Sequence, residues 1–239
     1  MTVAILDARA GESIISALAA EGFETASLPA CKRLPSATES HPDMLAVRLG
    51  DTILTEKKYR EETPAVFDIL SAHLPRIMWR TADILLGESY PEDCRLNALL
   101  MGDRLFVKSD TAAPELLELA RERKIRIVTA KQGYPACTVL SLGDSHAITA
   151  DRGMAKLLRS EGIEVLLIKD GGILLPPYEY GFIGGASGVY KNKVYFLGDV
   201  SSHPSGEEII AFCRSAGYEP ISLCAGPLRD LGRIIFIDT

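Results

Sequence analysis

Three residues of the sequence have side chains suited to nucleophilic and proton-transfer chemistry. Cys137 stands in the stretch KQGYPACT, and His41 and Asp43 stand in HPDM. A cysteine thiolate attacks electron-poor carbon, a histidine moves protons, and a carboxylate pairs with nitrogen-bearing groups of a substrate. Pro42 favours an extended His41, so residues 41 and 43 are expected on one face of a strand. Whether the three side chains meet depends on the elements that carry them.

Each of these residues also has a structural interpretation. Free cysteine is among the most buried residue types, so Cys137 is either a nucleophile or a small buried hydrophobic residue. His41 and Asp43 either bind a ligand or form a turn and cap where a strand begins. The remaining histidines lie on different predicted elements, with no carboxylate or cysteine at metal-ligand spacing, and predict no metal site: His73, His146 and His203.

The composition is that of an ordinary folded protein. Of the 239 residues, 47% are hydrophobic and 24% are charged, enough for a substantial core in one or two domains. A net charge of -6 without a basic stripe argues against nucleic-acid binding. The N-terminus has no secretory pattern, and no apolar run approaches the roughly 20 residues that span a bilayer, so we predict a cytoplasmic protein without a membrane partner. Five cysteines without paired spacing predict reduced thiols.

A tight turn between two apolar runs recurs along the chain. The turn at Gly50-Asp51 in MLAVRLGDTILTE is followed by similar turns at Gly102-Asp103, Gly143-Asp144 and Lys191-Asn192. Gly, Asn and Asp tolerate the positive φ that two-residue hairpin turns require. A helical pattern follows each hairpin, and a third apolar run follows the helix. The repeating unit is therefore strand, strand, helix, strand.

The two ends of the chain complete a fifth unit. The N-terminal strand TVAILDA lacks a hairpin partner, whereas the C-terminal strand RIIFIDT has no helix after it. Joining them places the turns at intervals of about 40 to 52 residues. A doubly wound α/β sheet is the alternative, but it alternates single strands with helices. We predict one α/β domain of five units in a ring, with units at 31–80, 94–130, 134–170, 181–224, and 229–239 joined with 1–30.

This arrangement, together with HPDM, KQGYPACT and GFIGGASG (181–188), resembles the pentein fold, the five-bladed α/β propeller of guanidino-group-modifying enzymes. That fold includes arginine deiminases, dimethylarginine hydrolases and amidinotransferases, and also a noncatalytic ribosome anti-association factor. The three strings are similar to those of an uncharacterised bacterial branch. The resemblance covers the whole chain and implies ββαβ units, closure of the ring by the terminal strands, and chemistry without a cofactor.

The resemblance also implies where reactive residues belong. It places them where the first strand of each unit begins, with a cysteine in the last strand pair and a histidine in the fourth unit. This sequence has Arg229-Asp230-Leu231-Gly232 and Gly184-Gly185-Ala186-Ser187 at those starts. One interpretation is a rearranged site, in which Cys137, His41 and Asp43 form a hydrolase or amidinotransferase for a guanidino or amidino compound. The other is a noncatalytic module that binds a small molecule or a protein.

The remaining strand starts supply candidate ligand-binding residues. Asn97 and Asp230 are either structural links between units or contacts to a small guanidino- or amino-acid-like ligand. In GFIGGASG, the candidates are Gly184, Gly185 and Ser187. This stretch either brings backbone N–H groups close to a ligand or forms a crowded wall where side chains would collide. The oligomeric state is left open.

Overall fold

The computed structural model describes residues 2–239, and within that range the chain forms five three-stranded sheets. In each sheet the middle strand pairs antiparallel with one neighbour and parallel with the other, so all five are mixed. The sheets are β17–β1–β2 (Ile235–Asp238, Thr2–Asp7, Phe23–Leu28), β3–β4–β5 (Ala46–Leu49, Thr52–Glu56, Met78–Ala82), β6–β7–β8 (Leu99–Met101, Arg104–Val107, Arg126–Thr129), β9–β10–β11 (Val139–Leu142, His146–Thr149, Glu164–Leu167) and β13–β14–β15 (Ser187–Tyr190, Lys193–Phe196, Glu219–Ser222). A further parallel pair joins β12 (Ile173–Leu174) to β16 (Leu228–Arg229).

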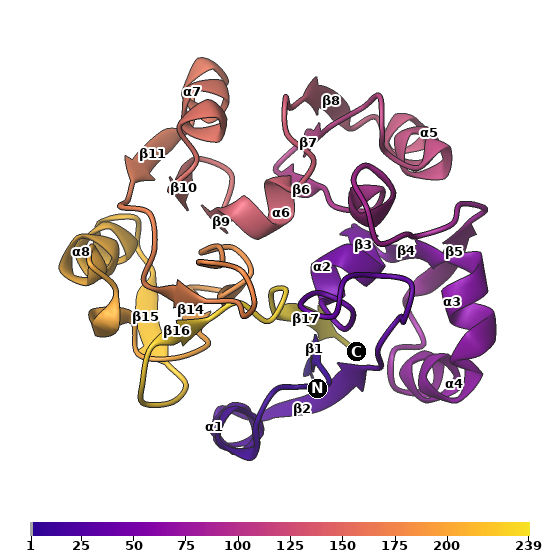
Figure 1. Cartoon of the computed structure of the whole chain (residues 1–239), viewed down its shortest axis with the longest axis horizontal. Helices are drawn as coiled ribbons and strands as arrows, with labels where there is room; N and C mark the ends of the chain where they lie inside the picture. Colours follow the sequence, from indigo (N-terminus) through magenta and orange to yellow (C-terminus); the bar gives the residue numbers. More distant parts are fainter. Residues whose placement is uncertain (1) are drawn as a thin grey trace.

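Helices connect the parallel pairs and lie at the rim of the molecule, outside the strands (Figure 1). The connecting helices are α1 (Glu12–Ala20), α3 (Lys57–Glu62) with α4 (Pro64–His73), α5 (Pro114–Glu122), α7 (Arg152–Ser160) and α8 (Gly206–Ser215). In α7, Met154, Ala155 and Leu158 are buried at helical spacing, and the Asp151 carboxylate caps the helix by accepting from Met154 N. None of the helices in the described range is long and apolar enough to cross a membrane.

The predicted hairpin turns are confirmed. The first turn residue has positive φ in all four hairpins of the described chain: 63° at Gly50, 60° at Gly102, 64° at Gly143 and 53° at Lys191. Such turns match the right-handed twist of the flanking strands. The two-strand runs recognised in the sequence are therefore antiparallel pairs in the structure.

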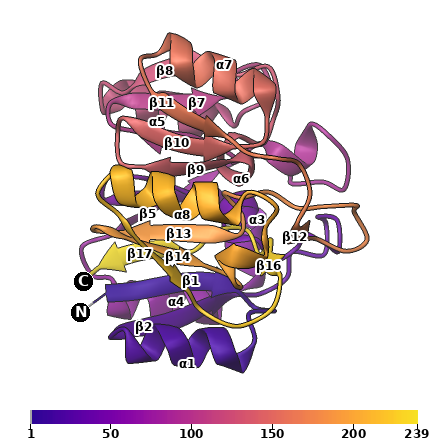
Figure 2. The ribbon, with the colours of Figure 1, turned by 90° about the vertical axis from the view of Figure 1, so that its left-hand side faces the viewer.

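The first and last strands belong to one sheet. β1 pairs antiparallel with β17, with Val3 opposite Ile237, and parallel with β2 on its other side. Both views place the two chain ends close together (Figure 1 and Figure 2). The sheet that contains both ends thus has the same strand pattern as the other four described sheets.

Two predicted strand starts are short helices instead. Pro42–Leu45 forms α2 and Pro135–Thr138 forms α6, each with proline in the first turn. Proline suits that position because its ring fixes a helical φ and its missing N–H has no partner to lose. His41 is extended but caps α2, whereas Asp43 lies inside it. The expectation that residues 41 and 43 share one face of a strand is therefore wrong. Two 3₁₀ turns, η1 (Glu92–Cys94) and η2 (Val200–Ser202), were also not predicted.

Candidate functional site

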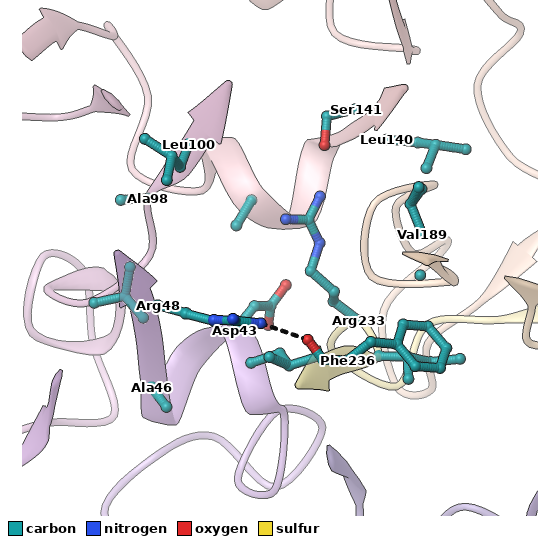
Figure 3. Close-up of a pocket in the computed structure, with 15 residues that line it drawn as sticks. Asp43, Ala46, Arg48, Ala98, Leu100, Leu140, Ser141, Val189, Arg233 and Phe236 are labelled. Atoms are coloured by element: carbon teal, nitrogen blue, oxygen red, sulfur yellow. Dashed lines mark hydrogen bonds between the residues drawn. The ribbon is translucent and has the colours of Figure 1, made fainter. Parts of the chain in front are cut away.

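Two cavities adjoin the buried polar residues at the centre of the molecule. The channel cavity, about 250 Å³, is lined by residues of β3, β6, β9, β13 and β17 together with Asp43 and Arg233 (Figure 3). The loop cavity, about 360 Å³, is lined by loop residues and by His41, Cys137 and Asp230. The cavities share no lining residue. The predicted catalytic residues therefore divide between them, since only Asp43 faces the channel cavity.

Asn97 holds this centre together. Its Nδ2 donates to the backbone oxygen of Asp43 at 3.2 Å and lies 3.0 Å from Cys137 Sγ, while its Oδ1 accepts from Ala136 N at 2.8 Å. The amide thus links segments from three of the predicted units. We call Asp43, Asn97 and Cys137 the polar wall. The geometry supports the interpretation of Asn97 as a structural link, and a ligand contact stays a prediction.

The Cys137 thiol is buried in α6 and is held in its neutral form. Burial raises the pKa of Cys137 well above its usual value, and the charges of Asp43 and Asp230 act in the same direction. The hydrogen bond from Asn97 acts in the opposite direction. A cysteine attacks as the thiolate, which this environment disfavours.

Asp43 is a buried carboxylate whose hydrogen bonding is incomplete, with the Cys137 thiol as a weak donor beside it. Only 3% of the residue is exposed, and among residues 2–239 no group makes a hydrogen bond of good geometry to either carboxylate oxygen. Burial raises the pKa of Asp43 to about 6, although Cys137 and Arg233 act in the opposite direction. Buried polar groups normally have partners, so this carboxylate marks a place where a ligand group would be stabilised.

His41 lies between two carboxylates at the edge of the loop cavity. Its Nε2 is 3.8 Å from Asp7 Oδ2 and its Nδ1 is 3.8 Å from Asp230 Oδ1, both beyond hydrogen-bond length. Burial lowers the pKa of His41 to about 4, against the effect of the Asp7 charge. The imidazole is therefore neutral at pH 7, and burial disfavours its protonation. Asp7 itself is paired with Arg9, whose Nη2 lies 2.6 Å from Asp7 Oδ2.

Backbone N–H groups of two loop segments orient the carboxylate of Asp230. Its Oδ2 accepts from Phe182 N at 2.9 Å and its Oδ1 accepts from Gly232 N at 3.1 Å. Burial and the neighbouring Asp43 charge raise the pKa of Asp230 to about 7, whereas the two backbone donors lower it. The carboxylate is fixed in position and close to its titration midpoint at neutral pH.

The loop cavity has the electrostatics of a cation site. Its lining contains the carboxylates of Asp93, Glu179 and Asp230 and no lysine or arginine. Tyr134 donates its hydroxyl to Asp93 Oδ2 at 2.7 Å, and the other oxygen of Asp93 has no donor in the described chain. Burial raises the pKa of Asp93. Aromatic rings complete the lining, and both carboxylates and aromatic faces attract cations: Tyr134, Tyr178, Tyr180 and Phe182.

The sequence matches one protein-family model over nearly its whole length. A family model described as "Family of unknown function (DUF6873)" matches residues 5–235. The chain belongs to this family. No curated protein matches the sequence of this DUF6873 member.

Solved structures resemble this DUF6873 protein over most of its length. A cysteine-to-serine mutant of dimethylarginine dimethylaminohydrolase (DDAH) from Pseudomonas aeruginosa, complexed with citrulline, has a TM-score of 0.59 and 13% identity, covering 92% of this chain and 90% of that one. The inosamine-phosphate amidinotransferase of Streptomyces griseus has a TM-score of 0.54 and 13% identity, covering 88% and 72%. An amidinotransferase of saxitoxin biosynthesis from Microseira wollei has a TM-score of 0.55 and 12% identity, covering 87% and 72%. At such identity the likeness establishes the fold, and the chain is a pentein-fold α/β protein with mixed sheets.

The predicted catalytic trio is only partly brought together in this DUF6873 protein. His41 and Cys137 line the same cavity, but the part of the chain that the structure describes has no hydrogen bond between the imidazole and the thiol. Asp43 lies in the polar wall and faces the other cavity. Whether the three act in catalysis stays a prediction. Residues 2–239 contain no group of three or more histidine, cysteine and acidic residues that could hold a metal ion.

The glycines of GFIGGASG lie where a side chain would not fit. A Cβ on Gly185 would lie 1.9 Å from Asp230 Oδ1, and one on Gly184 would lie 2.3 Å from the backbone oxygen of Ala136. Ser187 is buried and donates its hydroxyl to the backbone oxygen of Ile183 at 2.7 Å. Their positions support a crowded wall between units, and a direct ligand contact of these three residues stays a prediction.

Sequence reasoning missed five charged residues of the two cavities and their surroundings: Asp7, Arg48, Asp93, Glu179 and Arg233. Asp7 ends the first strand, and Asp93 directly precedes the second unit. Arg233 follows the expected start 229–232 by one residue. The available signal was the adjacency of these three to a predicted strand end or strand start, which alone does not reveal the direction of the side chain.

Proposed function

We propose that this protein binds a small guanidino or amidino cation in the loop cavity. The observation that carries the proposal is the lining itself, which combines three carboxylates and four aromatic rings with no basic residue other than a largely neutral histidine. A bound cation favours the ionised forms of Asp93 and Asp230 and offsets the effect of burial on their pKa values. The bound citrulline of the similar DDAH structure supports a ligand of guanidine-like shape.

Titration calorimetry with agmatine, methylguanidine and benzamidine tests this proposal. The neutral compound methylurea is the matched control, since it has nearly the shape of methylguanidine without the charge. At least one cation should bind, and methylurea should bind at least tenfold more weakly. Asp93→Asn should weaken the cation by about tenfold or more, because a charge-assisted hydrogen bond contributes about 1.5–3 kcal/mol. Glu92→Gln, at the exposed neighbouring position, should bind as the wild type does. Equal affinity of the Asp93→Asn variant would contradict the proposal.

Catalysis through Cys137 is the second candidate function. Its support is that Cys137 and His41 line the same cavity as the acidic residues. The neutral, buried thiol and the missing thiol–imidazole hydrogen bond favour binding without turnover in the described state. An enzyme would act as a hydrolase or amidinotransferase, and Cys137→Ala would abolish turnover while the fold persisted.

The electrophile 2-chloroacetamidine separates the two candidates. A nucleophilic Cys137 would be labelled faster in the folded protein than in urea, with labelling lost at low pH as the thiolate is protonated. We expect labelling no faster than in the denatured control, which corresponds to a binding module. Cys137→Ala identifies the labelled residue against the partly exposed Cys224.

We also infer that the five sheets are the blades of one closed propeller, in which residues 1–239 form a single domain. The pairing of β1 with β17 and the channel cavity bounded by one strand from each sheet support this interpretation. The ring matters for function because it brings residues of the first, third and last units to the loop cavity. A cytoplasmic location stays a prediction.

A further inference from the structure

The channel cavity contains a set of charges separate from those of the loop cavity. Figure 3 shows Arg48, from β3, and Arg233, from the segment just before β17, reaching into it, with Asp43 between their guanidinium groups. We propose that the channel cavity is a second ligand site for a small α-amino acid zwitterion. The two arginines hold the ligand carboxylate, and Asp43 accepts hydrogen bonds from the ligand ammonium.

Neither arginine has a carboxylate within ion-pair distance among the described residues. Arg48 donates to backbone oxygens, from Nη1 to Phe236 at 2.6 Å and from Nε to Gly50 at 2.8 Å. Arg233 Nη2 donates to the backbone oxygen of Val139 at 3.0 Å. A guanidinium has five N–H donors, so both side chains keep donors for a ligand. Their planar, forked geometry matches a carboxylate.

The backbone of Arg233 provides an independent observation. Its φ is 70°, in the left-handed region, where a residue with a side chain is strained. The other non-glycine residues of the described chain with positive φ, Lys124 and Lys191, are exposed in turns. Arg233, by contrast, is partly buried and lines the channel cavity. Strained backbone of this kind occurs at ligand sites, where the surrounding structure holds it in place.

The carboxylate of Asp43 favours a zwitterion over a simple anion as the ligand of the channel cavity. Its carboxylate is buried, has no donor of good geometry in the described chain, and lines the same cavity as the arginines. A simple anion between the arginines would be repelled by this carboxylate, whereas an ammonium group would pair with it. A ligand with both groups satisfies all three side chains.

The volume of the channel cavity and its uncharged lining residues indicate which amino acids would fit. A volume of about 250 Å³ lies below the roughly 300–1,000 Å³ of pockets for drug-sized ligands. Leu140, Val189 and Phe236 provide apolar surface, and Ser141 adds a hydroxyl (Figure 3). Small neutral amino acids fit this lining better than long charged ones.

Titration calorimetry with glycine, L-alanine, L-serine and L-valine tests the proposal. Acetate and methylammonium serve as probes that carry only one of the two charges. At least one amino acid should bind at least tenfold more tightly than either half-probe. Arg48→Gln and Arg233→Gln should each weaken that amino acid at least tenfold, and Asp43→Asn should remove its advantage over acetate. Arg76→Gln is the matched control at an exposed arginine, and its affinity should be unchanged.

Three results would overturn the proposal. Acetate that binds as tightly as every amino acid would mean a plain anion site. The absence of binding by all four amino acids would exclude the proposed ligand class, and undiminished binding by Arg48→Gln would place the ligand elsewhere. Arg48 pairs only with backbone oxygens, so its variant decides the matter even if Arg233→Gln does not fold. Arg48→Gln should bind whichever of agmatine, methylguanidine and benzamidine the wild type binds, with unchanged affinity, which separates this site from the loop cavity.

Discussion

Burial shifts Asp43, His41 and Asp230 toward their neutral forms. The pKa of the histidine falls to about 4, whereas those of the two aspartates rise to about 6 and about 7. These shifts oppose each other in their effect on stability. The neutral histidine contributes stability above its unfolded pKa of about 6.5 that is lost as pH falls through about 4. The neutral aspartates contribute stability at low pH that is lost as pH rises.

Asp43→Asn should gain stability relative to the wild type as pH rises. The folded protein retains a proton on Asp43 up to about pH 6, whereas the ordinary pKa is 3.8. The contribution of this group is fully present below pH 3.8 and is lost as pH passes about 6. Replacing it should therefore raise the relative free energy of unfolding by up to about 3 kcal/mol between pH 4 and pH 8. Urea denaturation across this range measures the change.

The exposed Asp170→Asn is the control for that measurement and should follow the wild type at every pH. A difference between Asp43→Asn and the wild type that is constant with pH would contradict the buried, proton-retaining carboxylate. The same variant should also lower the pKa of Asp230, because the charge of Asp43 raises it.

Among the elements, the segment 181–188 packs closely against its neighbours. It separates the unit that carries Cys137 from the segment that carries Asp230, and backbone hydrogen bonds join it to both. Gly185 N donates to the backbone oxygen of Cys137 at 3.0 Å, and Gly185 O accepts from Arg233 N at 2.9 Å. The orientation of residues in both cavities therefore depends on this segment.

Gly185→Ala should destabilise the protein by about 1–3 kcal/mol, as overpacking in a core does. The added Cβ would lie 1.9 Å from Asp230 Oδ1, so the carboxylate must move. Binding of the guanidino or amidino cation in the loop cavity should weaken in the same variant. Gly11→Ala is the matched control, because no atom lies within 4 Å of a Cβ at that helix start. Urea denaturation of both variants measures the difference, and equal stability would contradict the close packing.

The elements also show what the sequence could and could not predict. Hairpins were predictable, because Gly-Asp pairs between apolar runs have a local cause in positive φ. The helices α2 and α6 were not, since four residues are too few to show a helical period. In the structure Cys137 and His41 line the same cavity, whereas Asp43, which the sequence placed on the same strand face as His41, lies inside α2 and faces the other cavity. The inward path of Arg233 depends on a strained φ that no local pattern indicates.

At the scale of the whole molecule, the sheet β17–β1–β2 joins the two ends of the described chain. Thr2 pairs with Asp238 both along the backbone and through its hydroxyl, which donates to Asp238 Oδ1 at 2.8 Å. Removal of β17 would leave one edge of β1 without a partner and would remove Ile235 and Phe236 from the wall of the channel cavity. The pairing of β1 with β17 therefore also holds part of the wall of the channel cavity in place.

A circular permutant tests the closure. Residues 239 and 1 are joined by a short Gly-Ser linker, and new ends are opened between Lys191 and Asn192, in an exposed turn. The permutant should fold with an unchanged far-UV circular dichroism spectrum and with stability within about 2 kcal/mol of the wild type, since exposed turns tolerate new ends. Opening the chain inside β1, between Ala4 and Ile5, should prevent folding. Failure of the first permutant would argue against a closed ring.

The polar wall has one further consequence for how the protein responds to its surroundings. Asp43 and Cys137 face different cavities, yet the charge of the aspartate raises the pKa of the thiol. A positive group that settles against Asp43 from the channel would screen that charge and make the thiol easier to ionise on the opposite side. A cation bound in the channel cavity would therefore lower the pKa of Cys137 without touching the thiol.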